Sequence, residues 1–417
     1  ESMSNVLENP DQRAQDRISD LFLFAIFLDI HIFFANAIGR IFLGQSSLDT
    51  LLVYAILALL AVRAFPYIFA KKVSATYSAF VIAVLLFMTL SVVLNTELDA
   101  KVYSGVIRTA YIAVLAGSLL GSAVTDFEIL EAKLRKIGPV LALEMIVSFY
   151  IYHFVFKTEW GTGAMGLSYR LLVPAVLMLY SLFRKFNILE LLLFAVLFAI
   201  MLLQGSRGPL VAVVIFAVLY QLINLSENRR RVYFNIGILI AVTVVFFVNL
   251  DRVLKWIVAL CSKYGFYSKF LRVMMDGNFF EANGRDEVAA GVREIIAGNP
   301  FGNGFFAERP IINTYCHNIF LEFLVDFGVV FGSVLSVLFV GYLFRKLRSK
   351  NVVEKNVICI LLCAFLVKLL FSNSFWVEPV FFAFLRFITR QNQPVASTRV
   401  TEVEAVPKHE TNPDYQY

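Results

Sequence analysis

Long apolar runs alternate with short charged segments along the whole chain, and Ile236–Leu250 and Gly332–Phe344 are two examples. Apolar residues are continuous within each run, a pattern typical of helices rather than half-buried strands. We therefore predict an all-α polytopic membrane protein with about twelve spans, because a helix needs about 20 mostly apolar residues to cross a bilayer. The predicted spans lie near residues 20–38, 49–69, 75–94, 105–123, 138–156, 171–184, 187–204, 209–226, 233–250, 317–344, 355–373 and 377–390.

The distribution of basic residues predicts the orientation of these spans. Lys and Arg concentrate in the short cytoplasmic loops of membrane proteins. A cytoplasmic N-terminus places the clusters Arg229–Arg231 and Arg345–Lys350 on that same side, whereas the short opposite loops hold few basic residues. One helix more or fewer between them would place the two clusters on opposite sides of the membrane. We therefore predict an even number of spans and two cytoplasmic termini.

Residues 251–316 form one long predicted extracytoplasmic segment, which is largely exempt from the charge rule because of its length. Its basic residues therefore indicate ligand binding, and we predict that Arg293 and Arg309 bind substrate. The aromatic and basic stretch Asp251–Met275 is typical of a helix in the membrane interface. A second helix is predicted over Arg285–Ala297, before the helix-ending Gly298, Asn299 and Pro300.

The chain thus divides into four predicted segments. Residues 1–250 hold the first nine spans, residues 251–316 form the long loop with its amphipathic helices, and residues 317–390 hold the last three spans. Residues 391–417 are polar and contain proline, so we predict a disordered cytoplasmic tail.

The composition agrees with a membrane protein. Hydrophobic residues make up 59% of the chain and charged residues 16%, whereas soluble domains have about 45–50% and about 25%. The net charge of +6 follows from the cytoplasmic loops and does not indicate nucleic-acid binding. No nucleotide-binding glycine loop or metal-ligand spacing occurs, so we expect no cofactor. The sequence leaves open whether Cys261 and Cys316 form a disulfide.

The first candidate for chemistry is Arg207, in a Gly-Ser-Arg-Gly-Pro turn between two predicted spans. An arginine at the outer membrane edge could bind a diphosphate through both arms of its guanidinium. It could equally extend to the interface beside a helix-breaking turn.

Arg285 begins a loop helix and could reach a phosphate with help from the helix N-terminus. Its alternative is a solvated loop arginine.

The second candidate is His317, which lies where the long loop re-enters the membrane. A neutral imidazole there could take a proton from a hydroxyl as a general base. The alternative is a histidine that only packs at a helix start.

Downstream, Glu322 and Asp326 share a helix face and could line a polar cavity or pair with a basic residue. The Gly328 and Gly332 pair predicts close helix packing.

Three of these features together resemble the O-antigen ligase/polymerase superfamily of bacterial envelope enzymes. They are the Ser206–Gly208 turn, Gly284–Arg285 followed by a helix and the Asn299–Gly304 turn, and His317–Asn318 followed by Gly328. The resemblance covers residues 190–345. The family usually has Gly, Thr or Tyr where this chain has Phe331, which leaves the subfamily open.

The resemblance implies a glycosyltransferase of GT-C-like architecture in the bacterial inner membrane, with its active site on the periplasmic face. Such enzymes use glycan donors linked to undecaprenol by a diphosphate, without metal or nucleotide sugar. By resemblance, Arg207 and Arg285 hold the diphosphate and stabilise it as leaving group. His317 activates the acceptor hydroxyl, and Asn318 orients it.

Three functions remain after this resemblance. A polymerase would join lipid-linked repeat units of O-antigen, capsule or exopolysaccharide, with a chain-length regulator as a possible partner. We favour it because the Arg285–His317 interval is compact and its Pro-Phe-Gly-Asn-Gly turn is polymerase-like. An O-antigen ligase would instead transfer the glycan to lipid A–core. Ionisable residues inside predicted spans would favour a transporter of lipid-linked sugars, and these residues are Asp29, Arg108, Glu144 and Lys368.

Overall fold

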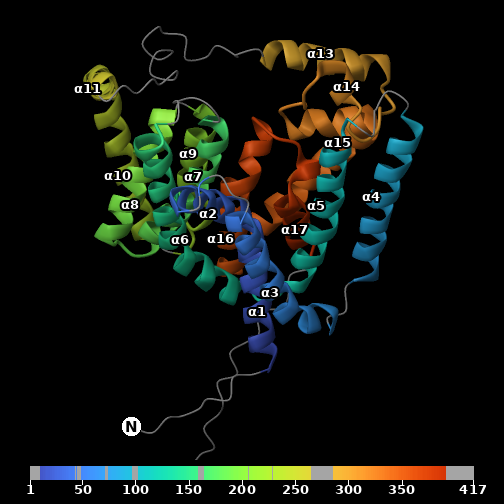
Figure 1. Cartoon of the computed structure of the whole chain (residues 1–417), viewed down its shortest axis with the longest axis horizontal. Coiled ribbons are helices and arrows are strands. Elements are labelled where there is room, and N and C mark those ends of the chain that lie inside the picture. Colours follow the sequence, from blue (N-terminus) through green and yellow to red (C-terminus); the bar gives the residue numbers. More distant parts are fainter. Residues whose placement is uncertain are drawn as a thin grey trace, which may run out of the picture.

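The computed structural model describes residues 10–42, 44, 48–70, 74–95, 102–157, 164–204, 206–227, 229–263 and 285–390. These residues form helices joined by short connections, and no strand occurs among them. The predicted all-α class is therefore confirmed. The helices stand side by side, and α13 lies across one end of the bundle (Figure 1).

The α-helices have the following bounds: α1 Pro10–Ile26, α2 Leu28–Phe42, α3 Leu48–Ala70, α4 Ala75–Leu94, α5 Ser104–Ala123, α6 Phe127–Tyr150, α7 Ala164–Arg184, α8 Ile188–Gln204, α9 Arg207–Ile223, α10 Arg229–Val248, α11 Leu250–Lys263, α13 Arg285–Gly298, α14 Glu308–Ile312, α15 Ile319–Leu347, α16 Val352–Leu361 and α17 Pro379–Thr389. Short π-helical or 3₁₀ segments are η1 Ile151–Val155, η2 Leu362–Leu366, η3 Val367–Leu370 and η4 Phe375–Val377. The core lies among α1, α5, α6, α7, α9, α16 and α17.

Six of the described helices are long and apolar enough to cross a membrane, and these are α3, α4, α5, α6 with η1, α7 and α15. The pair α1 and α2 passes the same test jointly, although the two helices are bent by 63°. The chain is therefore a multi-pass membrane protein by length and composition. The helices α8, α9 and α17 are apolar but shorter. The count of twelve spans and the GT-C-like architecture stay predictions.

The predicted single helix over residues 20–38 is wrong, because the chain bends between α1 and α2. Polar residues at the start of α2 explain the bend. Two guanidinium nitrogens of Arg170 on α7 donate to the Asp29 carboxylate, at 2.7 and 2.9 Å. His31 Nδ1 lies 2.9 Å from Glu144 Oε2 on α6. These contacts hold α2 against α6 and α7 rather than in line with α1.

The predicted helix over residues 355–373 is also interrupted. After α16, the chain continues as η2 and η3 and then turns towards η4. Lys368 forms an ion pair with Glu378, and Asn373 Nδ2 donates to Glu378 Oε2 at 3.3 Å. Non-helical backbone at membrane depth is tolerated where it is buried within protein. This broken segment, residues 362–378, contacts α7, α9 and α15, and it lies in the middle of the bundle, in red in Figure 1.

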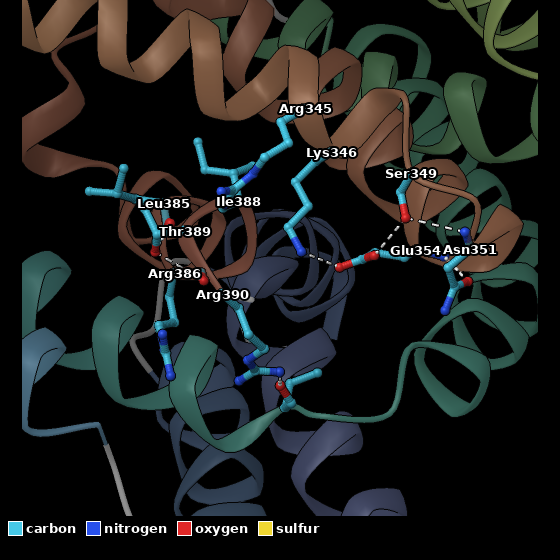
Figure 2. Close-up of polar contacts among 11 residues, drawn as sticks. Arg345, Lys346, Ser349, Asn351, Glu354, Leu385, Arg386, Ile388, Thr389 and Arg390 are labelled. Carbon is cyan, nitrogen blue, oxygen red and sulfur yellow. Dashed lines mark hydrogen bonds and ion pairs between the residues drawn. The ribbon is translucent and has the colours of Figure 1, made fainter. Parts of the chain in front are cut away.

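A polar cluster joins α15 to α16 at the opposite end from α13 (Figure 2). The fully buried Lys346 donates from Nζ to Glu354 Oε1 at 2.6 Å. The other oxygen of Glu354 accepts from Ser349 Oγ at 3.2 Å. Nearby, Arg390 donates to the Val124 carbonyl at 2.8 Å and so satisfies a group at the end of α5. Charged groups therefore fix this end of the bundle, which the basic-residue pattern assigns to the cytoplasm.

Replacing Lys346 with methionine is expected to lower the free energy of unfolding by about 3–5 kcal/mol, because Glu354 would remain buried without its cation. The measurement is the midpoint of thermal unfolding in detergent. The exposed Lys350 follows the same helix, and Lys350→Met is the matched control that should leave the midpoint unchanged. Equal midpoints for the two variants would contradict the prediction.

Candidate functional site

The helix α15 is broken at Gly328, and the loop before α14 fills the break. Gly328 has φ 80° and ψ 170° inside the helix. The carbonyls of Val325 and Asp326 accept hydrogen bonds from the backbone N–H groups of Asn303 and Gly304, at 2.8 and 3.1 Å. The loop thus supplies partners that the helix lacks at the break. The continuous helix predicted over residues 317–344 is wrong at this point.

Glycines make this close approach possible. A Cβ on Gly328 would lie 2.4 Å from the carbonyl carbon of Phe301, and one on Gly302 would lie 2.8 Å from the nitrogen of Gly328. A Cβ on Gly332 would lie 2.4 Å from the carbonyl oxygen of Phe323, so the two halves of α15 pack closely at the bend. Both glycines allow a close approach of backbone, but Gly328 packs against the loop and Gly332 against the first half of the same helix, so the predicted packing of a continuous helix against a neighbouring helix is wrong here. Two motifs that were weak in the sequence therefore form one structural unit.

His317 lies before Asn318, the residue that precedes α15, and is partly buried. Its backbone adopts the left-handed conformation, with φ 56°. Its ring centroid lies 4.2 Å from that of Tyr315. Asn318 Oδ1 accepts from the backbone N–H groups of Phe320 and Leu321, at 2.9 and 3.3 Å. Asn318 is thus an N-cap of α15, and its predicted role in orienting an acceptor stays a prediction.

Cys316 connects this site to α13. It is a free thiol, buried together with Val292 and Ile295 of α13 and Val325 of α15. The possible disulfide with Cys261 is therefore not formed. Burial, together with nearby carboxylates, raises the pKa of the Cys316 thiol. The thiol is thus a packing group that holds the neighbouring His317 beneath α13.

Arg207 is the first residue of α9 and is partly buried. The residue after it, Gly208, lies close to two other elements. A Cβ there would lie 2.3 Å from the Tyr169 hydroxyl of α7 and 3.7 Å from the Cβ of Phe371. The next residue, Ser372, has its Oγ 3.1 Å from the Tyr315 hydroxyl. Phe371 and Ser372 of the broken segment therefore contact two turns of the chain. One is the Ser206–Gly208 turn, which contains Arg207, and the other is the turn of residues 315–317, which contains His317.

The three other predicted arginines differ in their surroundings. Arg285 begins α13, which confirms the predicted loop helix, and its side chain lies outside the described atoms. Arg293 is exposed on α13. Arg309 is mostly buried, with its guanidinium 4.2 Å from the centre of the Phe306 ring. Substrate binding by these residues stays a prediction. The interfacial helix predicted over 251–275 is described only to Lys263, as α11.

Three buried carboxylates lie behind the site, and sequence reasoning missed Glu308. Glu322 accepts from Ser374 Oγ and from the backbone N–H of Phe375, and Asp326 Oδ2 accepts from Trp376 Nε1 at 2.6 Å. The hydrogen-bond donors to these two acids are thus neutral groups of the broken segment, and not the basic residue that the sequence analysis considered. Within the described part of the chain, no group of His, Cys, Asp and Glu is arranged to hold a metal ion.

Glu308 is fully buried, and its carboxylate makes no hydrogen bond to the described residues. Arg309 Nε lies 3.8 Å from its Oε1. Burial raises the pKa of Glu308 from 4.5 to about 7, against the opposing charge of Arg309. No motif in the sequence marks this residue, because its burial depends on the packing of α14 beneath α13.

The raised pKa of Glu308 predicts that the protein loses stability as the pH rises. Between pH 4.5 and 7, the folded state retains a proton that the unfolded state has released. The free energy of unfolding should therefore fall through this window, by about 3 kcal/mol at pH 8. Glu308→Gln should reduce this dependence, and Glu287→Gln, an exposed change on α13, should leave it unchanged. Thermal unfolding at pH 5 and pH 8 measures both, and an unchanged slope in Glu308→Gln would refute the assignment.

Comparison with known proteins places the site within a recognised segment. Residues 192–332 match the protein family described as O-antigen ligase. The matched segment contains the Arg207 turn, α13, His317 and the break in α15. Neither a curated protein nor a solved structure matches the chain. The predicted resemblance to the O-antigen ligase/polymerase superfamily is confirmed over this segment.

Proposed function

We propose, with this family match as the premise, that the protein is a membrane glycosyltransferase that polymerises lipid-linked oligosaccharide repeat units. The family supports O-antigen ligase/polymerase-type activity on lipid-linked glycans. The observation that carries the proposal is that one broken segment contacts both the Arg207 turn and the turn holding His317. Both turns lie at helix starts that the charge pattern assigns to the periplasmic side of the bacterial inner membrane.

The proposed reaction needs no cofactor. The acceptor hydroxyl gives its proton to the His317 imidazole, and its oxygen forms a bond to the anomeric carbon of the donor sugar. The bond between that carbon and the diphosphate oxygen breaks, and undecaprenyl diphosphate leaves with the electron pair. Arg207 and Arg285 stabilise the charge that develops on the diphosphate. Arg293 and Arg309 are proposed as further substrate contacts, and Asn318 as a contact to the acceptor.

The ligase is the second candidate, because the matched family is described as O-antigen ligase. It shares the donor and the periplasmic site, but its acceptor is lipid A–core. The transporter is less favoured, because the candidate groups lie at helix starts on one side rather than at the membrane midplane. The compact Arg285–His317 interval favours the polymerase, for which a chain-length regulator is a possible partner.

The acceptor distinguishes these functions. The purified protein is incubated with undecaprenyl-diphosphate-linked repeat units, a chelator and no nucleotide, and the products are separated by gel electrophoresis. We expect a ladder of lengthened lipid-linked glycans. Transfer only after addition of lipid A–core would identify a ligase. Absence of transfer to either acceptor by folded protein would contradict the enzyme proposal.

A further inference from the structure

The ring of His317 is held by a chain of contacts that ends on the broken segment. Tyr315 lies against His317, with ring centroids 4.2 Å apart and planes inclined by 48°. The Tyr315 hydroxyl lies 3.1 Å from Ser372 Oγ. Ser372 is buried and donates its own proton to Met165 Sδ of α7, at 3.3 Å. The hydrogen bond between the two hydroxyls therefore ties the Tyr315 ring to the broken segment, and Ser372 in turn contacts α7.

The broken segment also fixes the other half of the site. Phe371, the residue before Ser372, lies beside Gly208 and thus beside the Ser206–Gly208 turn that contains Arg207. The ion pair between Lys368 and Glu378 closes the chain around this dipeptide. Both Phe371 and Ser372 lie outside the matched residues 192–332. A segment after the family match therefore separates its two candidate catalytic turns.

We propose that Tyr315 and Ser372 are positioning residues, which orient the His317 ring relative to the Arg207 turn. The proposal rests on the proposed function, because it assigns these residues to the reaction at His317. The Tyr315 ring limits the rotation of the imidazole, and the hydrogen bond to Ser372 limits the rotation of the Tyr315 ring. A general base acts efficiently only within hydrogen-bond reach of the proton it removes. Loss of this hydrogen bond should therefore affect kcat more than KM.

The experiment compares Tyr315→Phe, Ser372→Ala and the double variant in the polymerisation assay. Each single change removes the same hydrogen bond and is expected to lower kcat by about 3- to 10-fold, with little change in KM. The double variant should be no slower than either single one, because contributions of one shared contact are not additive. Tyr111→Phe is the matched control, since the Tyr111 hydroxyl bonds Thr89 Oγ1 at 2.8 Å on other helices. It should leave kcat unchanged.

A second readout does not depend on glycan transfer. Diethyl pyrocarbonate modifies histidine rings, and peptide mass spectrometry follows His317 separately, with His31 and His153 as internal references. Tyr315→Phe and Ser372→Ala should each raise the modification rate of His317 by about two- to threefold, because the ring gains freedom. Tyr111→Phe should not change it. A general structural defect would instead change the modification rates of all three histidines together.

The outcomes separate the two proposals. Equal, non-additive losses of kcat with faster modification of His317 would support the positioning roles. Unchanged kcat and unchanged modification, or fully additive losses, would overturn them. If the unchanged protein transfers no glycan while Tyr315→Phe still alters the modification rate of His317, the proposed function fails and the contact to the ring stands. If His317→Ala retains full transfer, the general-base role and the positioning roles fail, although the protein is still a glycosyltransferase.

Discussion

Replacing His317 with alanine is expected to lower the rate of glycan transfer by about 10²–10⁴-fold, the usual contribution of a positioned general base. The protein should still fold, because α15 keeps its N-cap from Asn318 and its core contact through Cys316. Donor binding should change little, because the arginines assigned to the diphosphate are intact. The loss should therefore appear in kcat rather than in KM. The measurement is the initial rate of glycan elongation at several donor concentrations.

The control for this change is His409→Ala, which removes a histidine from the polar C-terminal tail. It should transfer glycan at the rate of the unchanged protein. The unfolding midpoint of His317→Ala is measured in parallel, so that a loss of folded protein is not counted as a loss of chemistry. Full activity in folded His317→Ala would exclude the general-base role and favour the alternative of a packing residue at a helix start.

The sequence predicted the elements whose signals are local. The helix at Arg285 and the span after His317 begin where polar residues precede an apolar or periodic run, and such boundaries follow from capping. The bend between α1 and α2 and the interruption after α16 were missed. The bend depends on Arg170, which is distant in the chain from Asp29, and the interruption depends on the ion pair that Lys368 forms with Glu378 across a turn. A run of apolar residues carries no signal for contacts of this kind.

The site divides in the same way. Residue type and position in the sequence were enough to select Arg207, Arg285 and His317 as candidates for chemistry. The docking of the Asn299–Gly304 turn into the break of α15 could not, because it is made by backbone hydrogen bonds between residues more than twenty positions apart. Glu308 illustrates the same point, since the sequence contains an ordinary glutamate before Arg309 and only the fold buries it.

Gly328→Ala is expected to be the most disruptive of the small substitutions in α15. The added Cβ would lie 2.4 Å from the carbonyl carbon of Phe301 and 2.6 Å from the carbonyl oxygen of Pro300, both of them backbone atoms that cannot move aside as a flexible side chain can. The φ of +80° adds strain for any residue with a Cβ. Together these effects should cost about 3 kcal/mol or more. The variant should unfold at a lower temperature in detergent.

The control lies on the same helix. A Cβ on Gly341 meets nothing within 4 Å, and alanine is favoured over glycine inside a helix by about 0.5–1 kcal/mol. Gly341→Ala should therefore melt at or slightly above the normal temperature. Any folded Gly328→Ala should also transfer glycan slowly, because expulsion of the Pro300–Gly304 loop shifts the half-helix that begins after His317. If the two alanine variants unfold at the same temperature and transfer glycan at the same rate, the break in α15 is not needed for stability or activity. The loop would then be an accessory to the site and not part of its framework.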